Sequence, residues 1–289
     1  MEKTPILDQL LEQTDLLQEV PLGAGLEADV VKICSDEFCV ALKTWNKGAS
    51  PDVGYQFSVL QALRAQGISV SMPLGWGYDE ASHKVLVTSF DGQPIDYTES
   101  QNVNQLAGIL AQIHRFPVSG DLSLRTYDFL PYFFPDIEKT PDLLDILKPL
   151  CEKADIRQDR LVHGDFNMLN ILESNGAYTV IDWTNAQLGD ARYDLAWASF
   201  LIKVYVDEKA YDDFLNVYFQ QHPSSDRDLE IFEAIACLRW LQLYRVAELP
   251  MLENTVAQVN DFIEQNKHLP EELLLDAYVY HIRGRGNAT

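Results

Sequence analysis

The sequence has few cysteines and few positive charges, and both shortages exclude classes of protein. Its four cysteines, Cys34, Cys39, Cys151 and Cys237, include no Cys-x-x-Cys pair and are too sparse for a disulfide framework in 289 residues. A reducing compartment, and hence a cytoplasmic location, fits this usage. Lys and Arg number 22 against 44 Asp and Glu, so the formal net charge is −22 and the field repels phosphate backbones. We therefore expect no nucleic-acid partner.

Long hydrophobic runs are also lacking. The longest, Leu195–Ile202, stops at Lys203, and the N-terminus has no basic stretch followed by an apolar core. We expect neither a membrane span nor a secretion signal. The six histidines are scattered, without a His-Glu-x-x-His motif or a Cys/His cluster at zinc spacing, which argues against structural zinc. The acidic charge would favour cationic small molecules, or it serves solubility alone.

The chain changes character near residue 92, where Asp91-Gly92-Gln93-Pro94 has the composition of a turn. Before it, the pattern predicts a helix over 7–20, strands over 30–33 and 38–42, a helix from the N-cap Ser50 to Gly67, and strands over 74–78 and 85–88. After it, the pattern predicts helices over 102–115, 141–153, 194–205, 208–221, 226–249 and 252–266. We expect an α+β chain with one domain over 1–92 and a mostly helical one over 93–289.

One hairpin interrupts the helical half. Asn175-Gly176 is a strong signal for a two-residue turn, and the register that follows from it makes Asn170 and Asp182 diagonal neighbours across the two strands. Asp165 lies five residues before Asn170, on the loop after a strand that ends at His163. We therefore expect three oxygen-bearing side chains to converge at one end of the hairpin.

Such a group suits one kind of chemistry. A carboxylate and an amide without thiolate or imidazole partners suit Mg²⁺, which keeps most of its waters and usually binds substrate phosphates as well. The pattern therefore indicates phosphoryl transfer. Taken singly, the three residues are also typical of a turn, a cap and a solvated strand end. A metallohydrolase built from His163, Asp165 and Asp182 is the other chemical reading, but it needs more histidines nearby.

The residues of this hairpin also resemble a known family. His163-Gly164-Asp165-Phe166-Asn167-Met168-Leu169-Asn170, followed by Ile181-Asp182-Trp183, resembles the H-G-D-x-x-x-x-N … I-D-W signature of the aminoglycoside phosphotransferase family. The segment 189–196 is similar to the family's G-D-x-x-x-D-L-A. The resemblance implies a two-lobed, protein-kinase-like α+β fold with a small sheet-containing N-terminal lobe. It also implies transfer of the γ-phosphate of ATP or GTP to a hydroxyl of a small molecule.

The resemblance assigns roles within the hairpin and its loop. Asp165 would be the catalytic residue that accepts the proton of the acceptor hydroxyl. Asn170 and Asp182 would hold Mg²⁺ ions that bridge the phosphates. His163 would support the loop. Asp194 looks like the family's buried Asp that hydrogen-bonds the catalytic loop, or it is simply a helix N-cap.

The first half should then hold the nucleotide. The segment Gly23–Val30 fits the kinase G-x-G-x-x-G-x-V loop with alanine at the third glycine, and Val40-Ala41-Leu42-Lys43 is similar to the kinase V-A-I-K strand. A plain hairpin turn and an exposed strand-end lysine are the other readings. Residues 87–92 resemble the kinase hinge that contacts adenine, although any crossover between domains shows the same pattern. The expected nucleotide-binding residues are Gly23, Gly25, Val30, Ala41, Lys43, Gln56, Ser89, Phe90 and Asp91.

One position departs from the family pattern. The helix after Lys43 should carry a glutamate that pairs with this lysine, but Gln56 stands there, and the only acid nearby is Asp52. We expect either residue to lie near Lys43. The departure leaves an alternative function, a nucleotide-binding protein without transferase activity.

The acceptor is not identified by the sequence. Related groups of the family act on macrolides, choline and homoserine, which keeps a metabolite kinase as an alternative to an aminoglycoside kinase. The acids at 207–208, 212–213, 226, 228, 230 and 233 are either a carboxylate-lined site for a cationic substrate or, the interpretation we favour, solvated helix faces. The aromatic residues over 127–134 are best explained by core packing.

Overall fold

The computed structural model describes residues 2–5, 7–8, 12, 17–24, 28–36, 38–95, 102–118, 122–222, 226–247 and 249–276. The chain divides into two compact units, each built from segments that are separated in the sequence. Unit 1 comprises Met1–Ile95, Phe116–Ser123 and Met168–Ala186, and unit 2 comprises Asp96–Arg115, Leu124–Asn167 and Gln187–Thr289. Unit 1 therefore contains the hairpin around residue 175, which the sequence analysis assigned to the second domain.

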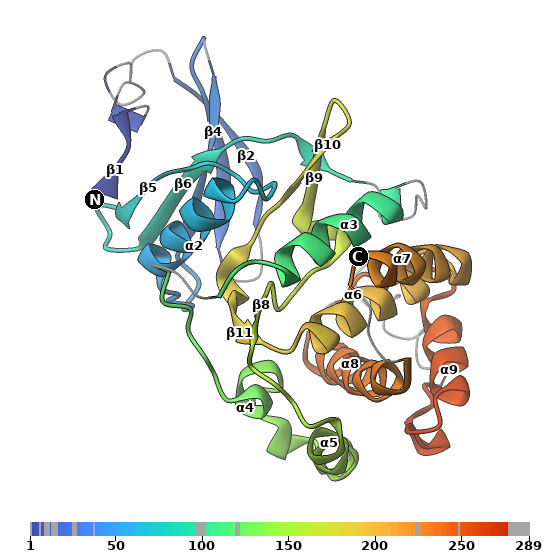
Figure 1. The fold of residues 1–289 in the computed structure, drawn as a ribbon. Helices are drawn as coiled ribbons and strands as arrows, with labels where there is room; N and C mark the ends of the chain where they lie inside the picture. The colour runs from blue at the N-terminus through green and yellow to red at the C-terminus, as the bar shows by residue number, and fades with distance from the viewer. Residues whose placement is uncertain are drawn as a thin grey trace. The chain divides into compact units, whose positions relative to one another are not determined.

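An antiparallel six-stranded sheet forms the larger part of unit 1, in the order β1-β5-β6-β4-β3-β2 (Figure 1). Its strands are β1 (Glu2–Lys3), β2 (Gln18–Ala24), β3 (Asp29–Cys34), β4 (Cys39–Trp45), β5 (Pro73–Tyr78) and β6 (Lys84–Ser89). The four strands expected over 30–33, 38–42, 74–78 and 85–88 are confirmed. One face of the sheet carries a hydrophobic cluster of Val40, Leu74 and Val87, because alternate residues of a strand point to the same side.

The helix expected over 7–20 is wrong at its C-terminal end, where the chain forms β2. Residues 18–20 pair with residues 32–34 of β3. Pro21 follows directly, and the residue before a proline is disfavoured in the helical conformation. The hydrogen bonds offered by β3 therefore outweigh the local amphipathic pattern. Much of the remaining expected helix lies outside the described residues.

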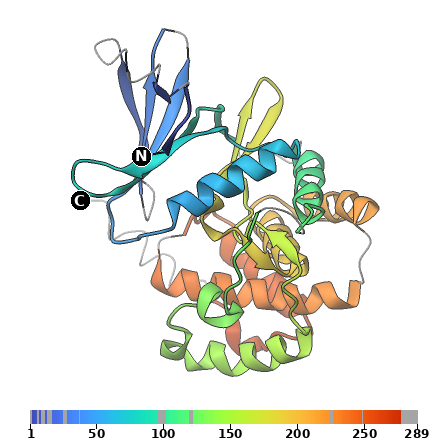
Figure 2. The same cartoon turned by 60° about the vertical axis from the view of Figure 1, so that its left-hand side comes forward.

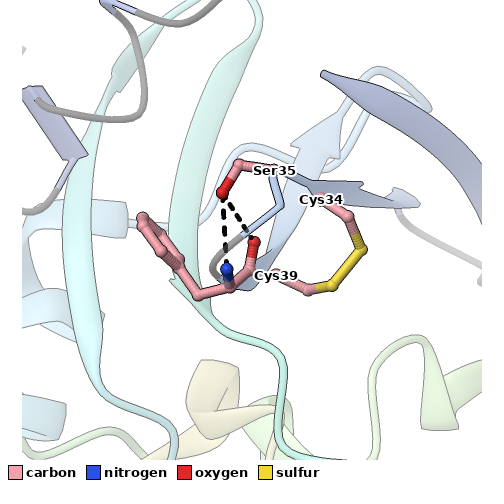
Figure 3. The surroundings of a disulfide bond; sticks show 4 residues. Cys34, Ser35 and Cys39 are labelled. Carbon is pink, nitrogen blue, oxygen red and sulfur yellow. Dashed lines mark hydrogen bonds between the residues drawn. A yellow bond between two sulfur atoms is a disulfide. The ribbon is translucent and has the colours of Figure 1, made fainter. Parts of the chain in front are cut away.

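Cys34 and Cys39 form a disulfide at the turn between β3 and β4 (Figure 3). The register sets the two cysteines directly opposite each other, and hydrogen bonds between Ser35 and Phe38 close the turn. Residues that face each other on neighbouring antiparallel strands are close enough for their sulfur atoms to bond. The pair belongs neither to a disulfide framework nor to a Cys-x-x-Cys motif, so the cysteine spacing did not predict it. Cysteine usage therefore no longer argues for a reducing compartment.

Helix α2 (Val53–Ala65) packs against β5 and β6 of unit 1 (Figures 1 and 2). Its N-cap is Asp52, whose side chain accepts a hydrogen bond from the backbone N–H of Tyr55 at 2.9 Å. The cap expected at Ser50 is wrong because a carboxylate at Asp52 both accepts this bond and meets the positive end of the helix dipole. The buried side of α2 carries Val53, Phe57 and Leu60, together with polar Gln56.

A second, three-stranded sheet in unit 1 contains the chemically interesting hairpin. Its strands are β7 (Gln93–Pro94), β9 (Ile171–Ser174) and β10 (Ala177–Val180), in the order β10-β9-β7. Ser174 faces Ala177 across the turn, which is the pairing that a two-residue turn at Asn175-Gly176 requires. Asn175 and Gly176 both have positive φ, 52° and 81°, which is the conformation of the tight hairpin turn that Asn-Gly favours.

Gly92 joins the first sheet of unit 1 to the second. It has a φ of 124°, and a Cβ placed on it would lie 2.1 Å from the carbonyl oxygen of Glu173. Only glycine therefore lets the chain pass β9 at this point and begin β7.

Unit 2 is mostly helical. Its helices are α3 (Val103–His114), α4 (Phe129–Phe133), α5 (Pro141–Ala154), α6 (Ala191–Tyr205), α7 (Glu208–Gln221), α8 (Asp226–Val246) and α9 (Thr255–Gln265). A short antiparallel ladder of β8 (Arg160–Val162) and β11 (Gln187–Gly189) lies beside α3 and α6. Helix α6 contacts α7, α8 and α9, and its side chains are buried almost throughout (Figure 1). The six helices expected beyond residue 92 are confirmed.

Short 3-10 helices complete the two units, at η3 (Ile137–Lys139), η4 (Met168–Asn170), η5 (Trp183–Asn185) and η6 (Glu271–Leu273). Two of them, η4 and η5, flank the hairpin of unit 1. Among the described helices, none has the length and apolar character that a membrane span requires.

Candidate active site

A buried carboxylate in unit 2 fixes the loop that follows β8. Asp194 of α6 accepts the backbone N–H of His163 at 2.8 Å and that of Gly164 at 2.9 Å. Gly164 has a φ of 79°, so the loop needs glycine there. The N-cap of α6 is Asp190, whose side chain accepts the N–H of Arg192. Asp194 is therefore a loop anchor and not a helix cap.

His114 of α3, which the sequence analysis did not single out, holds this anchor in place. Its Nε2 donates to the Asp194 carboxylate at 3.1 Å, and its Nδ1 lies 2.6 Å from the hydroxyl oxygen of Tyr218 on α7. Burial by itself raises the pKa of Asp194, but the bond and charge of His114, together with His163, hold that pKa below its ordinary value. Asp194 is therefore ionised, and it accepts N–H groups from three residues.

Two side chains reach one oxygen of Asp165. The indole Nε1 of Trp197 donates to Asp165 Oδ1 at 2.9 Å, and Nη2 of Arg239 lies 3.7 Å from the same oxygen. The backbone N–H of Asp165 donates to Nδ1 of His163 at 3.3 Å, so the predicted supporting role of His163 has a concrete contact. Asp165 therefore sits at the meeting point of the loop, α6 and α8.

Arg239 was also missed by the sequence analysis. Its side chain is buried, and its Nη1 donates to the carbonyl oxygen of Gly164 at 2.9 Å and to the hydroxyl of Tyr193 at 3.3 Å. Burial opposes the charged form of Arg239, but Tyr193 and the Asp165 carboxylate raise its pKa overall. Burial also raises the pKa of Tyr193 to about 12, so this neighbour stays neutral. A signal existed: Arg239 is a lone charge within the apolar run 235–241.

In unit 1, the hairpin places two further predicted residues at one strand end. The N–H of Ile181 donates to the carbonyl oxygen of Asn170 at 2.9 Å, so Asn170 faces Ile181, in the register that the Asn-Gly turn predicts. Asp182 follows directly, in a left-handed conformation with φ 60°. Its Oδ1 accepts hydrogen bonds from Lys43 Nζ and from the Thr184 hydroxyl, both at 2.7 Å. Asp165 belongs to unit 2, so its convergence with Asn170 and Asp182 stays a prediction.

Asn170 and Asp182 fit a magnesium ion by the chemistry of their donors. Both offer oxygen, and Mg²⁺ typically takes one or two protein oxygens and fills its other positions with phosphate and water. Within the described parts of the chain, no group of three or more His, Cys, Asp or Glu could hold a metal by itself. For the metallohydrolase interpretation, His163 is buried and its Nδ1 accepts a backbone N–H, so this nitrogen does not face a metal ion.

The predicted nucleotide-binding residues of unit 1 line up across the sheet. Gly23 pairs with Val30, and Val30 pairs with Lys43, so these three residues form one row across β2, β3 and β4. Ala41 lies in the next row of the same face, two residues before Lys43. Gly25 lies outside the described residues.

The segment expected to be the hinge is tied to the neighbouring strands. The N–H of Ser89 donates to the carbonyl oxygen of Met72 at 2.9 Å, and the N–H of Phe90 donates to the carbonyl oxygen of Cys39 at 3.2 Å. The hydroxyl of Ser89 donates to the Asp91 carboxylate at 2.8 Å. Two of the three backbone donors of this segment are therefore used within unit 1.

The partner of Lys43 differs from both expectations. Neither Gln56 nor Asp52 bonds it: Asp52 caps α2, and Lys43 pairs with Asp182. Gln56 is buried, with 3% of its surface exposed, and its Nε2 has no hydrogen-bond partner. The helix has no carboxylate that could reach Lys43 from this face, so the lysine turns to the carboxylate of the hairpin.

The acidic residues of α7 and α8 have local roles. Asp207 caps α7 by accepting the N–H of Ala210, and other acids pair with lysines, as in Lys203–Glu208, Lys209–Asp213 and Lys267–Glu230. Glu233 is buried beside Tyr211. Apart from buried Glu233, these contacts support the interpretation of solvated, internally paired helix faces. The side chains of Asp226 and Asp228 lie outside the described residues.

Solved structures share this fold. A spectinomycin phosphotransferase, solved with ADP and spectinomycin, matches with a TM-score of 0.61 and 17% identity, covering 92% of this chain and 97% of its own. The choline kinase LicA from Streptococcus pneumoniae matches with a TM-score of 0.63 and 17% identity, covering 90% and 96%. An amicoumacin kinase, solved with AMP-PNP and Ca²⁺, matches with a TM-score of 0.64 and 16% identity, covering 92% and 96%. The fold is thus protein-kinase-like, as predicted.

Comparison of the sequence with curated proteins finds no match. The sequence profile of the phosphotransferase enzyme family, abbreviated APH, matches residues 19–232, which include the loop, the hairpin and Asp194. The match also covers the row of residues from Gly23 to Lys43. The chain therefore belongs to the phosphotransferase enzyme family, and it is a phosphotransferase.

Proposed function

We propose that this enzyme transfers the γ-phosphoryl group of ATP or GTP to a hydroxyl of a small molecule, with Mg²⁺. The observation that carries the proposal is the position of Asp165, on a loop fastened by two hydrogen bonds to ionised, buried Asp194. A rigidly held carboxylate next to a substrate hydroxyl is what phosphoryl transfer needs, because this reaction depends mainly on positioning.

In the proposed transfer, Asp165 is the base that accepts the hydroxyl proton. The acceptor oxygen forms a bond to the γ-phosphorus, and the bond from that phosphorus to the oxygen bridging the β- and γ-phosphates breaks. The hydroxyl proton moves to Asp165 and from there to solvent, and a nucleoside diphosphate leaves. Asp165 thus acts as the catalytic residue.

The donor nucleotide would bind to unit 1, whose N-terminal part, residues 1–92, we propose as the nucleotide-binding lobe, with 93–289 as the catalytic and substrate-binding lobe. Lys43 would contact the phosphates, and Gly23, Gly25, Val30 and Ala41 would line the nucleotide. The N–H groups of Ser89 and Phe90 are used within the sheet. Of the expected hinge residues, Asp91 would therefore supply the backbone N–H for adenine.

Asn170 and Asp182 would hold the metal. A bound Mg²⁺ supplies positive charge that neutralises the phosphate oxygens as negative charge develops. The chain's own contribution is the hairpin register, which keeps the amide and the carboxylate at one strand end. Lys43 already contacts the carboxylate and would stay near the phosphates.

The acceptor is a small molecule with a hydroxyl, and we propose a cationic one. The net charge of −22 supports this choice, because such a field raises the local concentration of cations. The same field disfavours nucleic acid. We also propose a cytoplasmic location without membrane attachment; the Cys34–Cys39 pair would then be open to reduction.

The test is transfer of labelled γ-phosphate, from ATP and from GTP, to a panel of aminoglycosides, macrolides, choline and amino alcohols. The proposal predicts a phosphorylated product from at least one acceptor, and transfer that is slower by about 10²-fold or more with the Asp165→Asn variant. Binding of nucleotide by the wild-type chain without transfer to any acceptor would instead support the non-catalytic alternative. The pairing of Lys43 with Asp182, together with a Gln56 Nε2 that has no hydrogen-bond partner, favours this second candidate.

A further inference from the structure

The carboxylate of Asp165 is held from two helices at a single oxygen atom. Trp197 of α6 donates to Oδ1 at 2.9 Å, and the Arg239 guanidinium of α8 lies 3.7 Å from the same atom. The two groups come from rigid elements that pack on each other within unit 2. Contacts from two rigid elements to one oxygen restrict rotation of a carboxylate far more than a single hydrogen bond would.

Arg239 is itself fastened on several sides. Its Nη1 donates to Gly164, the residue before Asp165, and to the hydroxyl of Tyr193. Its guanidinium carbon lies 4.2 Å from the ring centre of Trp197 and 5.1 Å from that of Phe133. Arginine stacks well on aromatic rings because its charge is delocalised over a plane. The cation therefore has little freedom to leave Asp165.

A buried cation is costly unless an anion compensates it. Within the described residues, the only carboxylate within 4.0 Å of Arg239 is that of Asp165. Asp194 faces Arg239 as well, but at longer range, and its bonds go to His114, His163 and Gly164. The position of Arg239 is thus matched to the proposed base and not to the loop anchor.

We propose that Arg239 is a positioning residue for Asp165, with Trp197 completing the hold. The inference rests on the proposed function and adds two residues to it. Arg239 keeps Asp165 in one orientation before the acceptor arrives, so less of the activation barrier goes into ordering the base.

The first test compares Arg239→Met with Arg245→Met in the full chain. Arg245 lies on the same helix but is exposed, and it pairs with Asp142. Because a misplaced base slows chemistry, Arg239→Met should lower kcat by about 10- to 100-fold while the dissociation constant for nucleotide changes less than about twofold. Arg245→Met should change neither. Unchanged kcat in Arg239→Met overturns the proposal.

The second test separates positioning from a general structural role. In an Asp165→Asn background there is no base left to position, so adding Arg239→Met should lower the residual rate less than about twofold. The same 10- to 100-fold loss in both backgrounds would mean that Arg239 acts on the fold, and the proposal falls. Arg239→Lys, which keeps the charge without the planar fork, should recover part of the kcat lost in Arg239→Met.

A third measurement needs no activity. The chain has five tryptophans, so the indole N–H signal of Trp197 can be assigned in a proton–nitrogen NMR spectrum from the Trp197→Phe variant. This signal reports the bond to Asp165, and it should shift in Arg239→Met but not in Arg245→Met. An unmoved signal contradicts the proposal. If the wild-type chain transfers phosphate to no acceptor, the proposed function fails and this inference falls with it. If the wild-type chain transfers phosphate and Arg239→Met has an unchanged kcat, the proposed function stands and only the inference about Arg239 is wrong.

Discussion

Lys43 Nζ donates to Asp182 Oδ1 at 2.7 Å, across 139 residues of sequence. This pair joins the first sheet of unit 1 to the hairpin, and it occupies the carboxylate that the family resemblance assigns to Mg²⁺. Helix α2, which should provide the partner of Lys43, carries buried Gln56 with an unpaired Nε2. The ammonium and the proposed metal ligand are therefore coupled directly.

The first prediction follows from this coupling. Gln56→Glu should preserve or raise transfer activity, because a carboxylate on α2 can take Lys43 and leave Asp182 for the metal; α2 contacts η5, which directly follows Asp182. Lys43→Ala should lower kcat about 100-fold by removing the phosphate contact. Steady-state kinetics checks both, with exposed Gln61→Glu on the same helix as the control. A tenfold or greater loss in Gln56→Glu alone would show that no cation is within reach.

Asp165→Asn tests the base. The variant should bind nucleotide as the wild type does, while turnover falls by about 10²–10⁴-fold, because the amide cannot accept the acceptor proton. Calorimetry measures binding and labelled transfer measures turnover. Wild-type turnover in the variant would remove Asp165 from the catalytic role.

Asp182→Ala tests the metal site separately from the base. The substitution removes the charge that would face Mg²⁺, so Mg-nucleotide should bind at least about tenfold more weakly, whereas metal-free nucleotide should be affected less. Calorimetry with and without Mg²⁺ gives both values. Equal Mg-nucleotide affinity in variant and wild type would move the metal site elsewhere.

His114→Ala should destabilise unit 2 through Asp194. It removes one donor from a fully buried carboxylate, and leaving a buried acceptor short of a hydrogen-bond partner costs about 1–3 kcal/mol. Urea unfolding measures the loss, and turnover should fall too, because Asp194 holds the loop of Asp165. His83→Ala is the control, since its bond to Asp79 is exposed and should contribute little to stability. Equal stability of the two variants would contradict the prediction.

The free energy of unfolding should depend on pH because of Glu233. Burial raises its pKa from 4.5 to about 7, although Tyr211, Lys203 and Ser199 act in the opposite direction. Between these two values the folded chain holds a proton that the unfolded chain has lost. The free energy of unfolding therefore falls as pH rises from 4.5 to 7, by about 3 kcal/mol at most, and levels off above.

Glu233→Gln should abolish this dependence. The free energy of unfolding of the variant minus that of the wild type should therefore be larger at pH 8 than at pH 4.5, as measured by urea unfolding. Exposed Glu264→Gln is the control. A stability difference that is the same at both pH values would mean that Glu233 titrates normally.

Local sequence patterns predicted much of the fold. The Asn175-Gly176 turn fixed the register of its hairpin, because a two-residue loop allows one pairing of the flanking strands. The helices beyond residue 92 followed from apolar periodicity. The end of the predicted helix over 7–20 failed because its last residues found a hydrogen-bonding partner in β3, which no local pattern records.

The sequence by itself determined the family, the hairpin register and the residues of the catalytic loop, since each depends on spacing within a short segment. The tertiary structure alone decided that Lys43 pairs with Asp182, that Trp197 and Arg239 meet at Asp165, and that His114 supports Asp194. It also decided the direct opposition of Cys34 and Cys39. The physical reason is that side-chain partners far apart in sequence are chosen by how helices and sheets pack, and packing depends on the whole chain and not on any one motif.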